Sequence, residues 1–165
     1  MIRVDFVNRK CRLIAEELSH LLHFKDDSLE EIAGDFIKLA AVERLLERII
    51  MRAIDINLHL IGELSSGMDE KSTRLTYRDS FLRLADYGVY PESFALEISK
   101  SAGLRNILLH DYNDVNRTLL HAAIQNCLRD YTIYIEHITA FIGFDEPEAF
   151  GVVEPLHDAL FHSAS

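Results

Sequence analysis

The stretch VERLLERIIMRAIDINLHLIGEL (residues 42–64) decides the expected fold of this 165-residue chain. Its apolar residues recur every three or four positions, which is the period of an α-helix with one buried face. The same helical phase already begins before this stretch. The apolar residues that keep it are Ile32, Phe36, Leu39, Leu46, Ile50, Ile54, Ile61 and Leu64. We therefore predict one helix from Ser28 to Ser65, about 50 Å long at 1.5 Å per residue. Such a helix must bend or extend into a partner, and Gly34 or Gly62 marks the expected bend.

The rest of the chain shows the same period with almost no strict alternation, which predicts an all-α fold. Ser28 and Glu31 form a capping box, and Thr76 with Asp79 is a second helix start. We expect an up-and-down bundle of about five helices, one of them very long. The other expected helices cover residues 5–24, 76–88, about 91–102 and about 115–142. Gly103 interrupts the pattern after the third of these.

The composition limits the possible partners. Lys and Arg number 17 against 27 Asp and Glu, so the net charge of −10 disfavours binding to nucleic acid through bulk charge. The chain has no run of about 18 apolar residues and a charged start, so we expect no membrane span, no signal peptide and a cytoplasmic location. Cys11 and Cys127 have no metal-binding spacing, which predicts buried free thiols.

Charge is distributed unevenly along the chain. Residues 144–165 hold five acids without Lys or Arg, so we divide the chain into a helical domain (1–143) and an acidic tail, either weakly ordered or a partner-facing strap. Arg44, Arg48 and Arg52 recur every four residues along one helix face. Either they contact RNA, or nearby acids at positions 43, 47 and 55 neutralise them.

Familiar cofactor and metalloenzyme motifs are absent: there is no GxxxxGK[ST], GxGxxG, HExxH, GxSxG or EF-hand loop. His20 and His23 lie three residues apart, but no third ligand accompanies them, and surface histidines are the better interpretation. We therefore expect neither a metal nor a cofactor.

One segment, GLRNILLHDY (residues 103–112), gathers groups that could carry chemistry. Arg105 is a permanent cation, whereas His110 titrates near neutral pH. An imidazole can exchange protons with the 2′-hydroxyl and the leaving 5′-oxygen of RNA, and a guanidinium can stabilise charge on phosphorus. One histidine cannot easily be acid and base at once, but two copies paired across a two-fold axis could be. Alternatively, Arg105 and His110 make a helix salt bridge and a helix cap, and Tyr112 simply packs on the bundle.

The run RNILLHDY, between two amphipathic helices, resembles the R-x4-H-x-Y signature of the HEPN superfamily and, within it, the HepT-like (DUF86-like) ribonuclease toxins. The resemblance covers about residues 1–143. It implies a homodimer, or a higher oligomer, whose motif helices meet to form a metal-independent ribonuclease site for RNA, with tRNA the expected substrate. Arg105 and His110 would be catalytic, Asn106 would orient the phosphate or the histidine, and Asp111 would support them.

The resemblance also implies a partner. Such toxins are paired with a minimal nucleotidyltransferase antitoxin that adds AMP to the motif tyrosine, which corresponds to Tyr112 here. Two other functions stay open: a non-enzymatic helical dimer that binds a nucleotide or the antitoxin, and an oligomer scaffold whose acidic tail contacts a partner.

Overall fold

The computed structural model describes residues 1–65, 74–108, 114–143 and 153–162. Within these ranges the chain forms helices and short connections without any strand, which confirms the all-α prediction. The elements are α1 (Val4–Leu21), the 3-10 turn η1 (Leu22–Phe24), α2 (Leu29–Ala33), α3 (Phe36–Leu64), α4 (Tyr77–Asp86), α5 (Glu92–Ser99), α6 (Ser101–Leu108), α7 (Asp114–Phe141) and α8 (Val153–Phe161).

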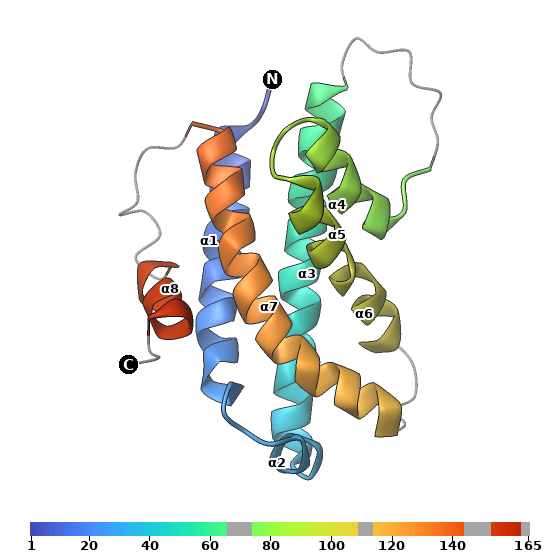
Figure 1. The fold of residues 1–165 in the computed structure, drawn as a ribbon, viewed down its shortest axis with the longest axis vertical. Coiled ribbons are helices and arrows are strands. Elements are labelled where there is room, and N and C mark those ends of the chain that lie inside the picture. Colours follow the sequence, from blue (N-terminus) through green and yellow to red (C-terminus); the bar gives the residue numbers. More distant parts are fainter. Residues whose placement is uncertain (66–73, 109–113, 144–152, 163–165) are drawn as a thin grey trace.

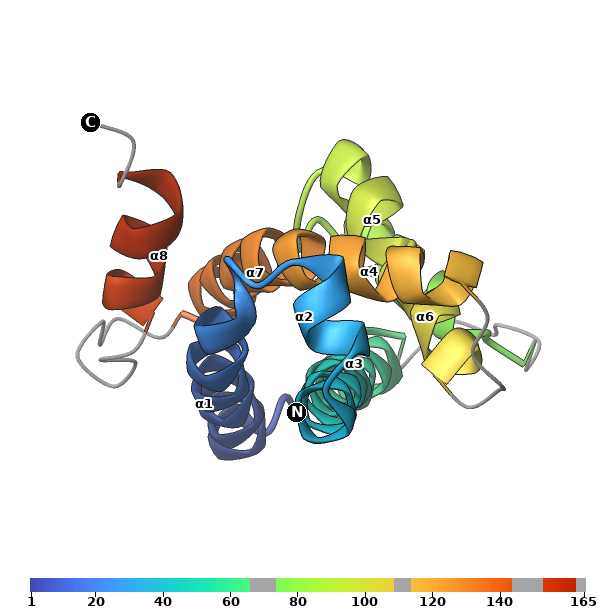
Figure 2. The same cartoon turned by 90° about the horizontal axis from the view of Figure 1, so that it is seen from below.

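Three long helices form the body of the molecule. In Figure 1, α7 runs across α1 and α3, and α1 packs along α3. The short helices α4, α5 and α6 gather on one side of α3, whereas α8 lies on the other side of the bundle against α7 and α1 (Figures 1 and 2). The segment from Arg105 onward therefore begins on the side of the bundle that α4, α5 and α6 form.

The predicted very long helix is broken near its start, so its expected length was wrong. The capping box of Ser28 and Glu31 is present, but the helix it begins, α2, ends after one turn at Gly34. A Cβ on Gly34 would lie 2.8 Å from the carbonyl oxygen of Glu30, so only glycine fits this close approach. Asp35 then starts α3 by accepting hydrogen bonds from the next helical amides. No break occurs at Gly62, which lies inside α3.

The second half of the bundle departs from the prediction in two places. Thr76 and Asp79 form the expected capping box of α4, and Gly88 follows that helix with a positive φ of 75°. Pro91, however, is the N-cap of α5 rather than its first helical residue. The next break comes at Lys100, between α5 and α6, and Gly103 lies within α6 instead of interrupting a helix. Arg105 and Asn106 are consequently helical residues.

The core combines aliphatic side chains from all three long helices with a cluster of aromatic rings. Phe81, Tyr131 and Tyr134 are fully buried and stack edge to face or at a tilt. Cys11 and Cys127 are buried free thiols, as predicted, and burial raises the pKa of each to about 12. Both thiols are therefore protonated and unreactive at neutral pH.

The C-terminal segment contains a helix that the sequence patterns did not predict. Leu156 of α8 is buried in the core cluster, and Leu160 packs against that cluster. Proline at position 155 is tolerated because it lies in the first turn of α8, where its missing N–H costs no helical hydrogen bond. In the part of the chain that the structure describes, no helix is long and apolar enough to cross a membrane.

Candidate functional site

The guanidinium of Arg105 lies against an aromatic ring of a neighbouring helix. Its Cζ atom is 5.0 Å from the centre of the Tyr77 ring, which is the geometry of a cation-π contact. Its Nε atom is buried and has no hydrogen-bond partner among the residues that the structure describes. Asn106, the next residue, is exposed. The ring thus holds the guanidinium, and its buried Nε donor is left unsatisfied.

Tyr77 is itself held from the core by a chain of hydrogen bonds. The buried hydroxyl of Tyr134 donates to Asn57 Oδ1 at 2.7 Å, and Asn57 Nδ2 donates to Ser80 Oγ at 3.2 Å. The Ser80 hydroxyl donates in turn to the backbone carbonyl of Tyr77 at 2.7 Å. Since Asn57 is completely buried, its two polar groups depend on these partners. The start of α4 is thereby fixed to α3 and α7.

The capping box of Thr76 and Asp79 also fixes the first turn of α4. The N–H of Asp79 donates to Thr76 Oγ1, and the N–H of Thr76 donates to Asp79 Oδ2, both at 3.1 Å. Hydrogen bonding from the Thr76 side chain, and then from its backbone N–H, lowers the pKa of the Asp79 carboxyl. Tyr77, the first helical residue, is therefore ordered before any ligand binds.

The beginning of α6 is anchored to α7. Ser101 Oγ lies 2.7 Å from the hydroxyl of Tyr131 on α7 and 2.6 Å from the carbonyl oxygen of Ile98. Burial raises the pKa of the Tyr131 hydroxyl well above its ordinary value, so this group stays a neutral hydrogen-bonding partner. α6 is thus tied to α7 at one end and contacts α4 through Arg105.

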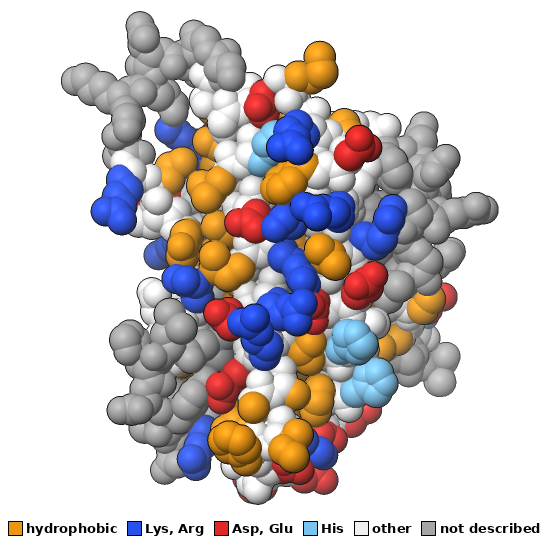
Figure 3. Space-filling view, turned by 180° about the vertical axis from the view of Figure 1, so that it is seen from behind, with side chains coloured by type: hydrophobic (Ala, Val, Ile, Leu, Met, Phe, Trp, Pro, Cys, Tyr) orange, Lys and Arg blue, Asp and Glu red, His pale blue; other side chains and the backbone are white. Residues whose placement is uncertain are grey.

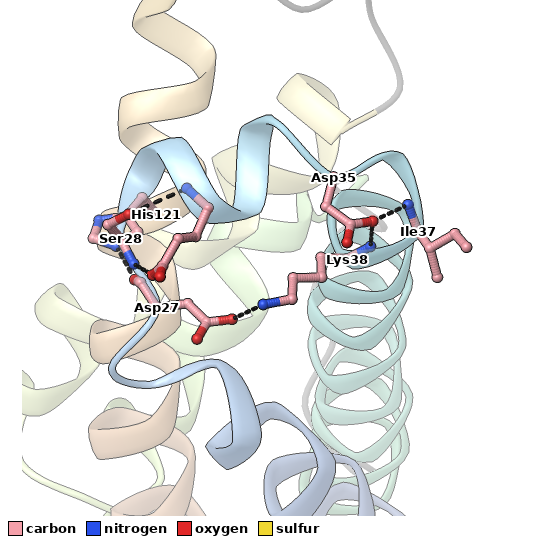
Figure 4. Close-up of polar contacts among 7 residues, drawn as sticks. Asp27, Ser28, Asp35, Ile37, Lys38 and His121 are labelled. Atoms are coloured by element: carbon pink, nitrogen blue, oxygen red, sulfur yellow. Dashed lines mark hydrogen bonds and ion pairs between the residues drawn. The ribbon is translucent and has the colours of Figure 1, made fainter.

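The N-terminal half of α7, which follows the motif segment, is anchored at the corner between α1 and α3 (Figure 4). His121 Nε2 lies 2.8 Å from the carbonyl oxygen of Asp27, and Gln125 Nε2 donates to the carbonyl of Lys25 at 2.6 Å. Lys38 of α3 pairs with the Asp27 carboxylate at 3.0 Å. The helices on both sides of residues 109–113 therefore have fixed positions. His110, Asp111 and Tyr112 themselves lie outside the described residues.

Comparison with known proteins decides the family. The family of HepT-like ribonucleases matches residues 14–138, which include Arg105, Asn106, His110 and Tyr112. The chain belongs to the HepT-like ribonuclease family. The resemblance that the run RNILLHDY indicated is thereby confirmed.

Two curated relatives of this HepT-like chain are named as nucleases. It is 32% identical over 136 residues to a tRNA nuclease HepT of Aphanizomenon flos-aquae, covering 82% of this chain and 89% of that protein. It is 31% identical over 106 residues to an mRNA nuclease HepT of Shewanella oneidensis, covering 64% of this chain and 76% of the relative.

Two solved structures share the fold of the HepT-like chain at 26% identity, and each match covers 82% of this chain and 98% of the other. One is a toxin-antitoxin structure with AMP-PNP, at a TM-score of 0.69. The other is a tri-AMPylated HEPN toxin of Shewanella oneidensis in complex with an MNT antitoxin, at a TM-score of 0.68.

The row of three arginines belongs to α3, and Arg48 and Arg52 reach Glu17 of α1. Figure 3 shows Lys and Arg side chains gathered on one face of the molecule. Arg52 Nη1 donates to Glu17 Oε1 at 2.6 Å, and Arg48 Nε forms an ion pair with the same oxygen at 3.0 Å. Arg44 pairs with Glu47 at 3.0 Å. Arg44 and Arg48 keep side chains 66% and 45% exposed, whereas that of Arg52 is 14% exposed. Arg52 is thus a structural residue, and only the other two present their charge to solvent.

A pocket of about 300 Å³ lies between α5, α6 and α7. Leu104 and Ile107 of α6 and Leu119 of α7 give it an apolar wall, while Asp130 and Lys100 supply charge. Burial raises the pKa of the Asp130 carboxyl, against the lowering effect of Arg129. Arg105 and Asn106 are not among its lining residues, so the pocket and the motif arginine use different faces of α6.

Sequence reasoning missed two features of the molecule. Tyr77 was not singled out, because a single tyrosine after a helix cap carries no motif. His157 and His162 were not singled out either, yet with Asp158 they form a cluster of possible metal ligands. The spacing of four between Asp158 and His162 was the available signal, since such residues share a helix face. The pair His20 and His23 has no third ligand in reach among the described residues.

Proposed function

We propose that this HepT-like chain is the toxin of a toxin-antitoxin pair and a metal-independent endoribonuclease that acts on tRNA. Arg105, Asn106 and His110 form its site, with Asp111 supporting them. The observation that carries the proposal is the guanidinium of Arg105, held on the Tyr77 ring with its Nε atom unpaired. Family membership supports ribonuclease activity. The preference for tRNA follows the relative with the longer match.

The proposed reaction needs one proton removed and one supplied. A His110 imidazole takes the proton of a ribose 2′-hydroxyl, and the 2′-oxygen attacks the adjacent phosphorus. The bond from phosphorus to the 5′-oxygen breaks as a second, protonated His110 gives its proton to that oxygen. Arg105 donates hydrogen bonds to the phosphoryl oxygens as their charge rises. The products are a 2′,3′-cyclic phosphate and a 5′-hydroxyl.

Two histidines in one reaction require two copies of the chain. We therefore propose a homodimer in which the motif segments, each at the end of α6, meet across a two-fold axis. Arg44 and Arg48 would guide the RNA backbone toward this site, since their side chains keep exposed charge on an otherwise acidic protein.

Replacement of Tyr77 tests how the site is held. We expect Tyr77→Leu to slow cleavage about 2-fold to 30-fold, because a cation-π contact contributes about 0.5 to 2 kcal/mol to the position of Arg105. Tyr77→Phe keeps the ring and should retain the wild-type rate. The measurement is the single-turnover cleavage rate of a labelled tRNA. If Tyr77→Phe is as slow as Tyr77→Leu, the ring does not position Arg105.

We further propose that a nucleotidyltransferase antitoxin inactivates the toxin by transferring AMP from ATP to the Tyr112 hydroxyl, with release of pyrophosphate. A tethered phosphate beside Arg105 would occupy the site of the substrate phosphate. The structural neighbour that is AMPylated and bound to an MNT antitoxin supports this proposal.

Intact mass after incubation with the cognate antitoxin, Mg²⁺ and ATP checks this modification. We expect adenylylation of the wild type and of Tyr77→Phe, which removes another exposed tyrosine, but none of Tyr112→Phe. An adduct of equal extent on Tyr112→Phe would place the modification on another residue.

A further inference from the structure

Two histidines and an aspartate lie close together on α8 and the turn residue that follows it, outside the range that the family matches. One donor atom from each of His157, Asp158 and His162 lies within 4.8 Å of the other two. His162 Nδ1 is 3.5 Å from Asp158 Oδ1, and the imidazole rings of His157 and His162 are 5.5 Å apart between centres. Three side chains with metal-binding atoms thus share one small region at the surface.

A fourth donor comes from the helix on which α8 packs. Glu136 of α7 places its Oε1 atom 3.7 Å from His157 Nε2. α8 packs on α7 and α1, and its Leu156 is buried in the core cluster. The position of α8 therefore brings a carboxylate of α7 next to the ligand atoms of α8.

We propose that Glu136, His157, Asp158 and His162 bind a zinc ion that fastens α8 to α7. Imidazole nitrogens with carboxylate oxygens suit Zn²⁺, whereas Mg²⁺ and Ca²⁺ prefer oxygen ligands alone. The two carboxylates also balance the charge of a dication.

Three of the four proposed ligands already lie close together, and Glu136 must move toward them to join the site. Bonds of about 2.0 to 2.2 Å place tetrahedral donors about 3.3 to 3.6 Å apart. The separations of 3.5 Å between His162 and Asp158 and 3.7 Å between His157 and Glu136 are close to this spacing. The side chains of Asp158 and His162 are 71% and 67% exposed, so they can turn toward an ion without disturbing the core.

The zinc site and the proposed ribonuclease site are independent of each other. α8 packs on α7 and α1, whereas Arg105 contacts Tyr77 of α4, on the side of the bundle where α4, α5 and α6 gather (Figure 1). The ion would have a structural role, because its four protein ligands leave no open position for a substrate.

Zinc titration of the full chain by calorimetry tests the proposal. We expect one Zn²⁺ per wild-type chain, at least tenfold weaker binding by His162→Ala, and no binding at this site by His157→Ala/His162→Ala. The matched control is His20→Ala/His23→Ala, which removes two exposed histidines of the N-terminal region and should bind like the wild type. Failure of the wild type to bind one zinc ion, or equal affinity in the α8 variants, would overturn the proposal.

Hydrogen exchange of the α8 amides tests separately whether zinc holds α8 on α7. Zinc should slow exchange across α8 in the wild type and in the His20 and His23 control, and should slow it less in Glu136→Gln, which lacks the α7 carboxylate. Zinc binding that leaves these amides unchanged contradicts a role in fastening α8. Removal of zinc with EDTA should not change RNA cleavage, so this experiment and the ribonuclease proposal can fail independently.

Discussion

His110→Ala is expected to slow RNA cleavage by a factor of about 10² to 10⁴, the usual contribution of a general acid or base. In the proposed dimer the loss is at the upper end of this range, because one substitution removes both the base and the acid. The single-turnover rate on labelled tRNA, with helicity followed by circular dichroism, measures the effect. Helicity should not change.

A matched control separates this effect from the general consequence of removing a histidine side chain. His20 is exposed on α1, far along the chain from the motif, and His20→Ala should cleave at the wild-type rate. Arg105→Ala should also lose cleavage while remaining folded, since the Arg105 cation is proposed to stabilise the negative charge that develops on the phosphoryl oxygens. Cleavage by purified His110→Ala at the wild-type rate would refute the assignment of the site.

Glu17→Ala is expected to lower the free energy of unfolding by about 2 to 4 kcal/mol, because it leaves two arginines without their shared carboxylate. Glu17 has a side chain only 9% exposed, and one of its oxygens accepts a hydrogen bond from Arg52 and forms an ion pair with Arg48. Arg52 is the more deeply buried cation and also donates to the carbonyl of Leu13 at 3.4 Å. Without Glu17, these two cations on adjacent turns of α3 repel each other.

Urea denaturation at a fixed protein concentration measures this loss, with two controls. Glu17→Gln keeps an acceptor at the same place and should lose less stability than Glu17→Ala. Arg44→Ala removes an exposed pair with Glu47 and should cost no more than about 0.5 kcal/mol. Equal stability of Glu17→Ala and the wild type would show that the shared carboxylate contributes nothing to the fold.

The local features of the fold could be predicted because they depend on neighbouring residues. The capping boxes at Ser28 and Thr76 are each complete within four residues, and both are present. The end of α2 at Gly34 was one of two expected bends. The helix α8 was missed, because its proline and acids disfavour a helix and its stability depends on burying Leu156 against distant helices.

Contacts between distant segments could not be predicted from periodicity. The partner of Arg48 and Arg52 is Glu17 on another helix, rather than the acids beside them in sequence; only the pairing of Arg44 with Glu47 was foreseen. The same holds for Tyr77, which reaches Arg105 only because α4 and α6 pack together. The family resemblance, in contrast, rested on a short contiguous run, RNILLHDY, and could be recognised without the fold.

The chemistry of the RNA ends tests the central claim most directly. Purified protein is incubated with total tRNA in excess EDTA, and the products are examined for their terminal groups. Metal-independent attack by a 2′-hydroxyl predicts cleavage to fragments with a 2′,3′-cyclic phosphate and a 5′-hydroxyl. Intact tRNA, from protein whose mass shows no adduct on Tyr112, or fragments with 5′-phosphate ends would contradict the account.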